Sequence, residues 1–530
     1  MEMSKITRAA GGVAATAALT VAAAMAPGTA GSATPLGTAT PIKHVVVIYQ
    51  ENVSFDHYFG TYPHAANTDG QRFQANPKTP RVNGLTPQLL THNPNSSNPR
   101  RLGPAQALTC DQDHEYKDEQ AAYDNYKMDK FIETVGNGDP GCEKRQVMDY
   151  YDGNTVTAMW NYAQHFAMSD NSYGTTFGPS TPGAVNLVSG QTHGVTAQLM
   201  PGGKPFPEGD TVANTIVGDP QPLGDDCSSR DQVRLSGRNV GDLLNEKNVT
   251  WGWFEGGFKP AQRKADGTAV CTVTQPDGSM LGGHPVGAAL GNTGQKGWKG
   301  DYIPHHEPFQ YYPSTANPHH LPPSSPAMIG RTDQANHQYD LTDFWAGANS
   351  GHLPAVSFLK AAGYQDGHAG YSDPIDEQQF VADTINRLQK LPEWRDTAVV
   401  LAYDDSDGWY DHQAGPLVNQ SQGAEDTLTG TGQCGHDPAK VMGGYEGRCG
   451  YGPRLPLLVI SPWANRDHVD HAVTDQTSVL KFVEDNWSLG RIGDSSFDAR
   501  AGSLDGLFDF KAPSAGRLFL DPKTGQRVDN

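Results

Sequence analysis

The chain has 530 residues, of which 36% are hydrophobic and 18% are charged, and its formal net charge is −20. This acidic balance argues against a nucleic-acid-binding protein, whose electrostatic footprint is a basic patch or stripe. The 60 Gly and 38 Pro exceed average usage but stay below the roughly 25–30% that indicates disorder. We therefore expect a globular fold with long loops.

The first 35 residues have the pattern of a secretory signal peptide. Lys5 and Arg8 precede an Ala- and Val-rich run that ends near Pro27, and small residues suited to cleavage follow. A membrane anchor is the alternative, but the run is dominated by Ala and is shorter than the roughly 20 residues that span a bilayer. No other segment is apolar enough to span, so we predict a secreted, extracellular protein without an integral membrane segment.

The six cysteines favour disulfide bonds, because their number is even and the protein is predicted to be exported. They form no CxxC pair, which argues against a zinc ribbon. Pairing in chain order is the simplest arrangement, although other connectivities remain open. In chain order the cysteines are Cys110, Cys142, Cys227, Cys271, Cys434 and Cys449.

Apolar runs recur along the rest of the chain and predict buried parallel strands. A helical pattern occupies 375–388, between two of these runs, and Asp475 can cap another helix that carries Val479 and Phe482. Strands that alternate with helices predict an α/β fold with a doubly wound sheet. The predicted strands span 43–49, 355–359, 398–402 and 455–460.

We expect one domain over 36–511 and a tail over 512–530 that forms a peripheral strand or a disordered end. Two segments, 61–145 and 200–335, are rich in Gly, Pro, Asn and Asp. Loops of this length in a compact domain are usually functional or disordered. We interpret both segments as insertions over the sheet edge at which a site lies.

Polar residues directly follow two of the predicted strands. Glu51 and Asn52 follow the first, and Asp404 and Asp405 follow the run 398–402. In open α/β sheets, ligands bind at the carboxyl ends of the strands. Converging carboxylates repel one another and are usually stabilised by a divalent cation. These residues predict a metal site; the alternative is that 404–411 is a solvated turn whose aspartates cap helices.

A Gly- and Pro-rich turn over 178–183 carries Ser180 and Thr181, either of which could act as a nucleophile. The alternative is an ordinary turn. Pro182 stands where the G-x-S-x-G nucleophile elbow needs its last Gly, which argues against a serine esterase of the α/β-hydrolase type.

Several of the 19 histidines lie in polar, loop-like surroundings. His305 and His306 are adjacent, His114 follows an acidic stretch, and His368 lies in a Gly-rich turn. Histidines in such places can protonate a leaving alkoxide or hydrogen-bond to phosphate oxygens. Each of them, taken alone, fits a structural role better than a catalytic one.

Five segments resemble, in the same order, motifs of the bacterial phosphoesterase family that contains phospholipases C and an acid phosphatase. They are HVVVIYQENVSFDHYFG (44–60), GPSTPGAVNLVSG (178–190), HHEPFQYY (305–312), YDDSDGWYDH (403–412) and GPRLPLLVISPWA (452–464). The resemblance covers about 41–510. It implies a three-layer α/β/α sandwich like that of alkaline phosphatases, with a mostly parallel central sheet and long loop insertions.

The resemblance also implies metal-dependent hydrolysis of phosphoric esters. A hydroxyl nucleophile would form a phosphoserine, and His305 or His306 would protonate the leaving oxygen. The implied ligand type suits calcium, magnesium or manganese. The implied metal ligands are Glu51, Asn52, Ser180, Asp404 and Asp405, and the implied catalytic residues are Ser180, His114, His305, His306 and His368.

Two positions depart from the family pattern. Gly183 and Ala184 replace the Asn-Arg that usually follows the nucleophile motif in phospholipase C relatives, and Val53 stands where relatives commonly carry Arg. The first departure removes local phosphate contacts and leaves Ser180 as the better candidate nucleophile than Thr181.

We predict a secreted, metal-dependent phosphoesterase of phospholipase C type, whose partner is a phosphate-ester substrate such as a phospholipid. An acid phosphatase that acts on phosphomonoesters is the alternative. A non-catalytic, secreted phosphate-binding protein is an alternative of another class, against which the retained carboxylates argue. The oligomeric state is left open by the sequence.

Overall fold

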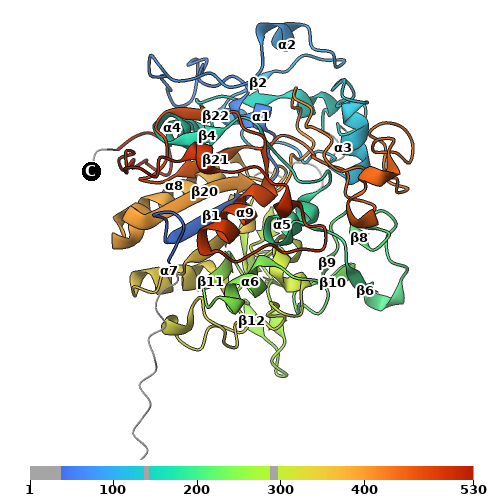
Figure 1. Cartoon of the computed structure of the whole chain (residues 1–530), viewed down its shortest axis with the longest axis vertical. Coiled ribbons are helices and arrows are strands. Elements are labelled where there is room, and N and C mark those ends of the chain that lie inside the picture. The colour runs from blue at the N-terminus through green and yellow to red at the C-terminus, as the bar shows by residue number, and fades with distance from the viewer. Residues whose placement is uncertain (1–36, 137–141, 287–296, 529–530) are drawn as a thin grey trace, which may run out of the picture. The chain divides into compact units, whose positions relative to one another are not determined.

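The computed structural model describes residues 37–136, 142–286 and 297–528, so the predicted signal peptide lies outside the described residues. An eight-stranded sheet runs through the molecule (Figure 1). Every strand of this sheet except β21 runs in the same direction. In order across the sheet, the strands are β18 (Gln338–Asp340), β11 (Trp251–Glu255), β19 (Val356–Lys360), β1 (His44–Gln50), β20 (Thr397–Tyr403), β21 (Leu457–Ile460), β4 (Ala167–Ser169) and β22 (His468–Asp470).

Strands β1 and β20 form the middle of the sheet. They pair in parallel over their whole length, from His44 opposite Thr397 to Gln50 opposite Tyr403. Their side chains are almost all buried, as expected for strands covered by helices on both faces. Because both strands end at the same edge, the residues that follow them emerge side by side.

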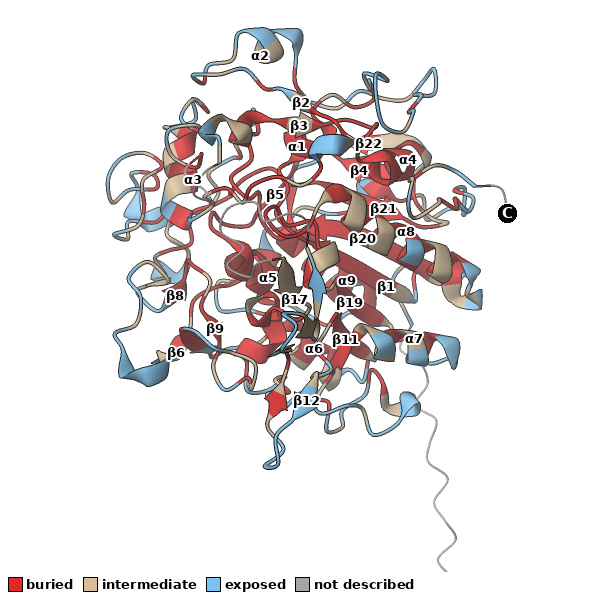
Figure 2. Ribbon diagram, turned by 180° about the vertical axis from the view of Figure 1, so that it is seen from behind, coloured by how far each residue is buried: buried red, intermediate tan, exposed pale blue. Residues whose placement is uncertain are grey.

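Helices cover both faces of the sheet (Figures 1 and 2), which confirms the predicted three-layer sandwich. On one face α5 packs against α9 and α6, and on the other α4 packs against α8. The helices are α1 (Phe55–Phe59), α2 (Pro87–Thr91), α3 (Tyr116–Tyr123), α4 (Thr157–His165), α5 (Ser180–Ser189), α6 (Val240–Glu246), α7 (Leu341–Asn349), α8 (Pro374–Lys390) and α9 (Gln476–Trp487).

The predicted helix over 375–388 is confirmed as α8, and Asp475 caps α9 as predicted, accepting a hydrogen bond from the backbone N–H of Thr477. Two features of the sheet differ from the sequence prediction. The apolar run 455–460 forms β21, which is antiparallel to β20, and the segment 200–335 contains β11, which belongs to the main sheet. An apolar run does not encode its direction, and β11 is a short run within Gly-rich sequence, so neither feature is visible in the pattern.

Three disulfide bonds cross-link the long loops, and their pairing is the predicted one in chain order. They join Cys110 to Cys142, Cys227 to Cys271 and Cys434 to Cys449. Each closes a loop in one of the Gly- and Pro-rich parts of the chain.

The described part of the predicted tail, 512–528, packs on the helices instead of forming a strand. The side-chain amide of Gln389 in α8 donates to the carbonyl of Leu518 at 2.7 Å, and Asn161 in α4 donates to the carbonyl of Gly525 at 2.8 Å. These contacts tie the end of the described chain to one helix layer.

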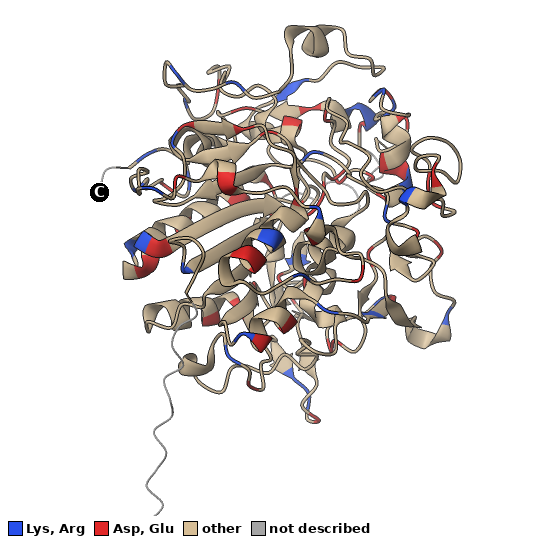
Figure 3. Ribbon diagram, viewed as in Figure 1, with Lys and Arg blue, Asp and Glu red and all other residues tan. Residues whose placement is uncertain are grey.

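Acidic and basic residues are interspersed along the described ribbon, with no basic stripe that would suit a polyanion (Figure 3). None of the described helices combines the length and the apolar character needed to cross a bilayer.

Candidate active site

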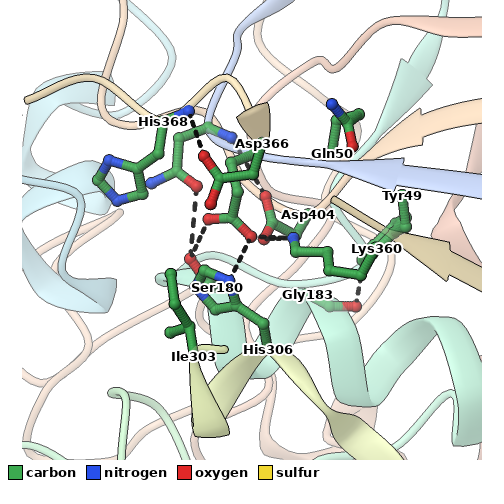
Figure 4. A network of polar contacts seen from close by, with 12 residues as sticks. Tyr49, Gln50, Ser180, Gly183, Ile303, His306, Lys360, Asp366, His368 and Asp404 are labelled. Carbon is green, nitrogen blue, oxygen red and sulfur yellow. Dashed lines mark hydrogen bonds and ion pairs between the residues drawn. The ribbon is translucent and has the colours of Figure 1, made fainter. Parts of the chain in front are cut away.

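A buried polar cluster lies at the carboxyl edge of the sheet (Figure 4). Glu51 follows β1, Asp404 and Asp405 follow β20, and Ser180 is the first residue of α5. All four side chains are at most 2% exposed. The alternative of a solvated turn after β20 is therefore wrong. The cluster lies where the sequence analysis expected a site, at the carboxyl ends of the strands.

The hydroxyl of Ser180 is surrounded by oxygen atoms. Its Oγ lies 3.0 Å from Asp405 Oδ2, 3.2 Å from Glu51 Oε2 and 3.4 Å from Asn52 Oδ1. A hydroxyl has one proton to donate, so it can satisfy only one of these three acceptors. A hydroxyl, an amide oxygen and two carboxylates in contact form a donor set that fits a hard divalent cation.

The start of α5 places Ser180 against the strand ends. A Cβ at Gly183 would lie 2.1 Å from the backbone oxygen of Asp404, so only Gly lets the helix come this close to β20. The hydroxyl of Tyr49 in β1 donates to the carbonyl of Gly183 at 2.9 Å. In addition, the N-terminus of a helix attracts negative charge, which suits a site for an anionic ligand.

Thr181, the alternative nucleophile, has different neighbours. Its backbone N–H donates to Asp219 Oδ1 at 2.8 Å, and its hydroxyl lies 3.5 Å from that of Tyr311. The carboxylate cluster therefore surrounds Ser180 and not Thr181.

The turn after β1 is locked to the end of β20. Asn52 has a φ of 50°, an uncommon conformation for a residue other than Gly. This conformation lets its backbone N–H donate to Asp404 Oδ1 at 3.2 Å, and the N–H of Asp405 donates to the same oxygen at 2.8 Å. The turns after β1 and β20, which are far apart in the sequence, thus both donate to the Asp404 carboxylate.

Lys360, the last residue of β19, is a site residue that the sequence prediction missed. Its buried ammonium contacts Glu51 Oε1 and lies 3.4 Å from Asp404 Oδ2 (Figure 4). Burial lowers the pKa of Lys360, but Asp404 and Glu51 more than offset this, so the pKa is raised and the group stays cationic. Lys360 directly follows the run 355–359, so the rule that selected Glu51 and Asp404 also identifies it.

The pair His305 and His306 comes from a short 3-10 turn in the segment 200–335. His306 Nδ1 lies 3.2 Å from Glu51 Oε1, and the two imidazoles meet edge to face with centroids 4.4 Å apart. Burial, followed by the charge of Lys360, lowers the pKa of His306 well below its usual range. A neutral imidazole therefore faces Glu51.

The other two predicted histidines lie on the same edge. His114 Nε2 is 3.4 Å from Asn52 Nδ2, its Nδ1 is 3.5 Å from Asp407 Oδ1, and the ring centroids of His114 and His368 are 6.0 Å apart. The backbone N–H of His368 donates to Asp366 Oδ1 at 3.0 Å (Figure 4). All the predicted site residues thus gather in one place.

Further possible metal ligands line the same edge. Their donor atoms fall into two groups, and within each group the atoms lie within 4.8 Å of one another. The groups are Glu51, His306 and Asp366, and Asp111, His114, His368 and Asp407.

A buried arginine holds the loops behind the cluster. Arg454 precedes β21, and because β21 is antiparallel its start reaches the ligand edge. The Arg454 guanidinium lies 3.0 Å from Asp56 Oδ1 and 3.1 Å from Asp411 Oδ2, and all three side chains are almost fully buried. These two ion pairs join α1, which follows β1, to the loop after β20.

A sequence model of the phosphoesterase family matches residues 42–490. The chain belongs to the phosphoesterase family. Among its curated relatives, the non-hemolytic phospholipases C of Pseudomonas aeruginosa and Burkholderia pseudomallei are 24% and 25% identical over 502 and 507 residues, or 92% of this chain in each case. Phospholipase C B of Mycobacterium tuberculosis is 25% identical over 516 residues, which cover 93% of this chain and 84% of that protein.

The chain spans 60% and 62% of the length of the Pseudomonas and Burkholderia relatives. Among solved structures, a protein from work on glycosaminoglycan metabolism by Bacteroides thetaiotaomicron aligns over 78% of this chain and 86% of its own, with 10% identity and a TM-score of 0.25. That score is too low to inform the fold, so the assignment to the phosphoesterase family depends on the sequence match.

Proposed function

We propose that this chain is a metal-dependent phosphoesterase of phospholipase C type that hydrolyses phosphoric esters through Ser180. The observation that carries the proposal is the convergence of the Ser180 hydroxyl with oxygens of Glu51, Asn52 and Asp405. Membership of the phosphoesterase family and the phospholipase C names of its relatives support it. Phosphomonoesters are the alternative substrates.

In this proposal, Glu51, Asn52, Ser180, Asp404 and Asp405 would hold a divalent cation, which would lower the pKa of the Ser180 hydroxyl and stabilise negative charge on the phosphoryl oxygens. Ser180 Oγ attacks phosphorus, and the bond from phosphorus to the leaving oxygen breaks. A neutral His305 or His306 takes up the proton that Ser180 releases and delivers it to that oxygen. Water then hydrolyses the phosphoserine, which releases the phosphate product and restores the hydroxyl.

The test is a panel of phosphoric esters assayed with and without a chelator, with Ser180→Ala and the matched variant Thr181→Val. We expect Ser180→Ala to lose at least about 10³-fold in kcat, since loss of a nucleophile removes the covalent route, and Thr181→Val to keep most of its activity. Full activity of Ser180→Ala would overturn the assignment. Activity that is insensitive to chelation would instead point to a serine esterase.

A non-catalytic phosphate-binding protein is the competing class. Buried carboxylates repel phosphate unless a cation lies between them, so this alternative needs the same metal but no turnover. The absence of hydrolysis for every ester tested, with divalent metal added, would favour it over the phosphoesterase.

We also propose that the protein is secreted after cleavage near residue 35. Three disulfide bonds favour an oxidising compartment, and the compact unit of the chain begins at Thr38, so cleavage there leaves the proposed catalytic domain over 36–511 intact. N-terminal sequencing of protein from culture medium should find a start near residue 36. An intact Met1 in that protein would contradict the proposal.

A further inference from the structure

A lysine of the segment 200–335 lies beside the active site, and no carboxylate among the described residues forms an ion pair with it. Lys299 belongs to β17 (Trp298–Gly300), and its ammonium lies 3.6 Å from the centroid of the Tyr371 ring. Within the described residues, Lys299 makes neither a hydrogen bond nor an ion pair through its side chain. A cation above a ring face keeps its N–H donors free for another acceptor.

Tyr371 connects this ammonium to the site. Its ring stacks on His368 with centroids 4.4 Å apart, and its hydroxyl donates to Asp366 Oδ2 at 3.2 Å. Lys299 is therefore linked through the Tyr371 ring to His368 and Asp366, two groups of the candidate active site.

Arg230 is a second cation of this kind from the same segment. Its Nη2 lies 3.4 Å from His305 Nδ1 and donates to the backbone carbonyl of Asp219. No carboxylate of the described chain lies within 4.0 Å of its guanidinium. Arg230 is exposed, so its remaining N–H donors are accessible to a ligand from solvent.

We propose that Lys299 and Arg230 form an anion subsite that binds the non-bridging oxygens of a doubly charged phosphoryl group and so selects phosphomonoesters over choline phosphodiesters. This inference rests on the chemistry of the proposed function, but it replaces the phospholipase C substrate with the phosphomonoester alternative named there. A phosphomonoester carries close to two negative charges near neutral pH, whereas a choline diester carries one and adds a cation. Two cations without anionic partners attract the first ligand and repel the second.

The decisive experiment compares p-nitrophenyl phosphate with p-nitrophenylphosphorylcholine, which share one leaving group. We expect the wild type to prefer the monoester. Lys299→Met and Arg230→Gln should each lower kcat/KM for the monoester roughly 10- to 100-fold, the loss expected for one hydrogen bond to a charged group, and should change the choline ester by less than about threefold.

The matched control is Lys264→Met, which removes a lysine from the same segment on the exposed hairpin of β12 (Gln262–Arg263) and β13 (Ala269–Val270), and which should change neither rate. A wild-type preference for the choline ester, or an equal fall on both esters in Lys299→Met, would overturn the subsite. Assaying phosphatidic acid in mixed micelles against glycerol 3-phosphate then identifies a lipid or a soluble monoester as the source of the dianion.

A binding measurement separates this inference from the proposed reaction. In the Ser180→Ala background, calorimetry with inorganic phosphate and added metal should give a Kd that Lys299→Met weakens roughly 10- to 100-fold. This result would support the subsite even if no ester were hydrolysed. An unchanged Kd would refute it even if the proposed phosphoesterase activity were confirmed.

Discussion

Replacing Lys360 by Met removes a buried ammonium and keeps most of its aliphatic stem. In the wild type this ammonium contacts Glu51 and Asp404, and the three side chains are at most 2% exposed. Removal of one partner of a buried ion pair costs about 3–5 kcal/mol, because the remaining charge stays buried without compensation. We therefore expect Lys360→Met to destabilise the metal-free protein by about this amount.

The magnitude converts to a measurable shift. Unfolding entropy is about 2.1 cal/mol/K per residue, which gives on the order of 1 kcal/mol/K for a chain of this length. A loss of about 3–5 kcal/mol then lowers Tm by roughly 3–5 °C. A bound divalent cation supplies charge to the same carboxylates, so metal should raise Tm more in Lys360→Met than in the wild type.

The assay is scanning calorimetry in chelator and in excess Mn²⁺. Lys43→Met is the matched control, because Lys43 is 62% exposed and pairs with Asp396 at 3.7 Å, a surface ion pair that contributes about 0–1 kcal/mol. An unchanged Tm of Lys360→Met in chelator would refute the view that Lys360 neutralises the cluster. An equal metal-induced shift in both proteins would refute the view that ammonium and metal stabilise the same carboxylates.

Three further predictions concern a glycine contact and two buried ion pairs. Gly183→Ala should lower kcat roughly 100-fold, because the new Cβ displaces α5 from the backbone of Asp404; steady-state kinetics that match the wild type would contradict this. Arg454→Met leaves the buried Asp411 without an ion-pair partner among the described residues, while Asp56 keeps His412. It should cost about 3–5 kcal/mol in denaturant unfolding, whereas a loss below about 1 kcal/mol would show that Arg454 is dispensable. Burial lowers the pKa of His320, but Asp225 at 3.1 Å raises it by more, so the net pKa is raised. The contribution of this ion pair to folding stability is therefore full below about pH 6.5, and it is lost as the pH rises through the raised pKa of the folded state. The Tm difference between wild type and His320→Gln should therefore shrink as pH increases, and a difference that grows would have the wrong sign.

The strand-end residues of the site follow from the sequence by one physical rule. Glu51 and Asp404 follow apolar runs, and parallel strands bring their carboxyl ends to one edge, so their proximity is predictable without coordinates. Lys360 obeys the same rule, and a lysine after a buried strand is informative because an unpaired ammonium is costly to bury. The direction of β21 cannot be predicted in this way, because its apolar pattern is the same for either orientation. Only the structure therefore shows that Arg454 lies at the ligand edge.

The positions of Lys299 and Arg230 could not be predicted from the sequence. Lys299 and Arg230 lie in a segment without helical or strand periodicity, whose path depends on long-range contacts such as the disulfide between Cys227 and Cys271. The acids of the site thus come from the strand ends, whereas Arg230 lies in the loop closed by that disulfide and Lys299 lies in the short strand β17. A sheet edge is rigid and a loop tolerates substitution, so changes of substrate should arise by mutation in 200–335, while loss of the reaction should arise at the strand ends. The net charge of −20 is compatible with the proposed phosphate substrate, because these few residues and the proposed cation would set the charge that faces the ligand.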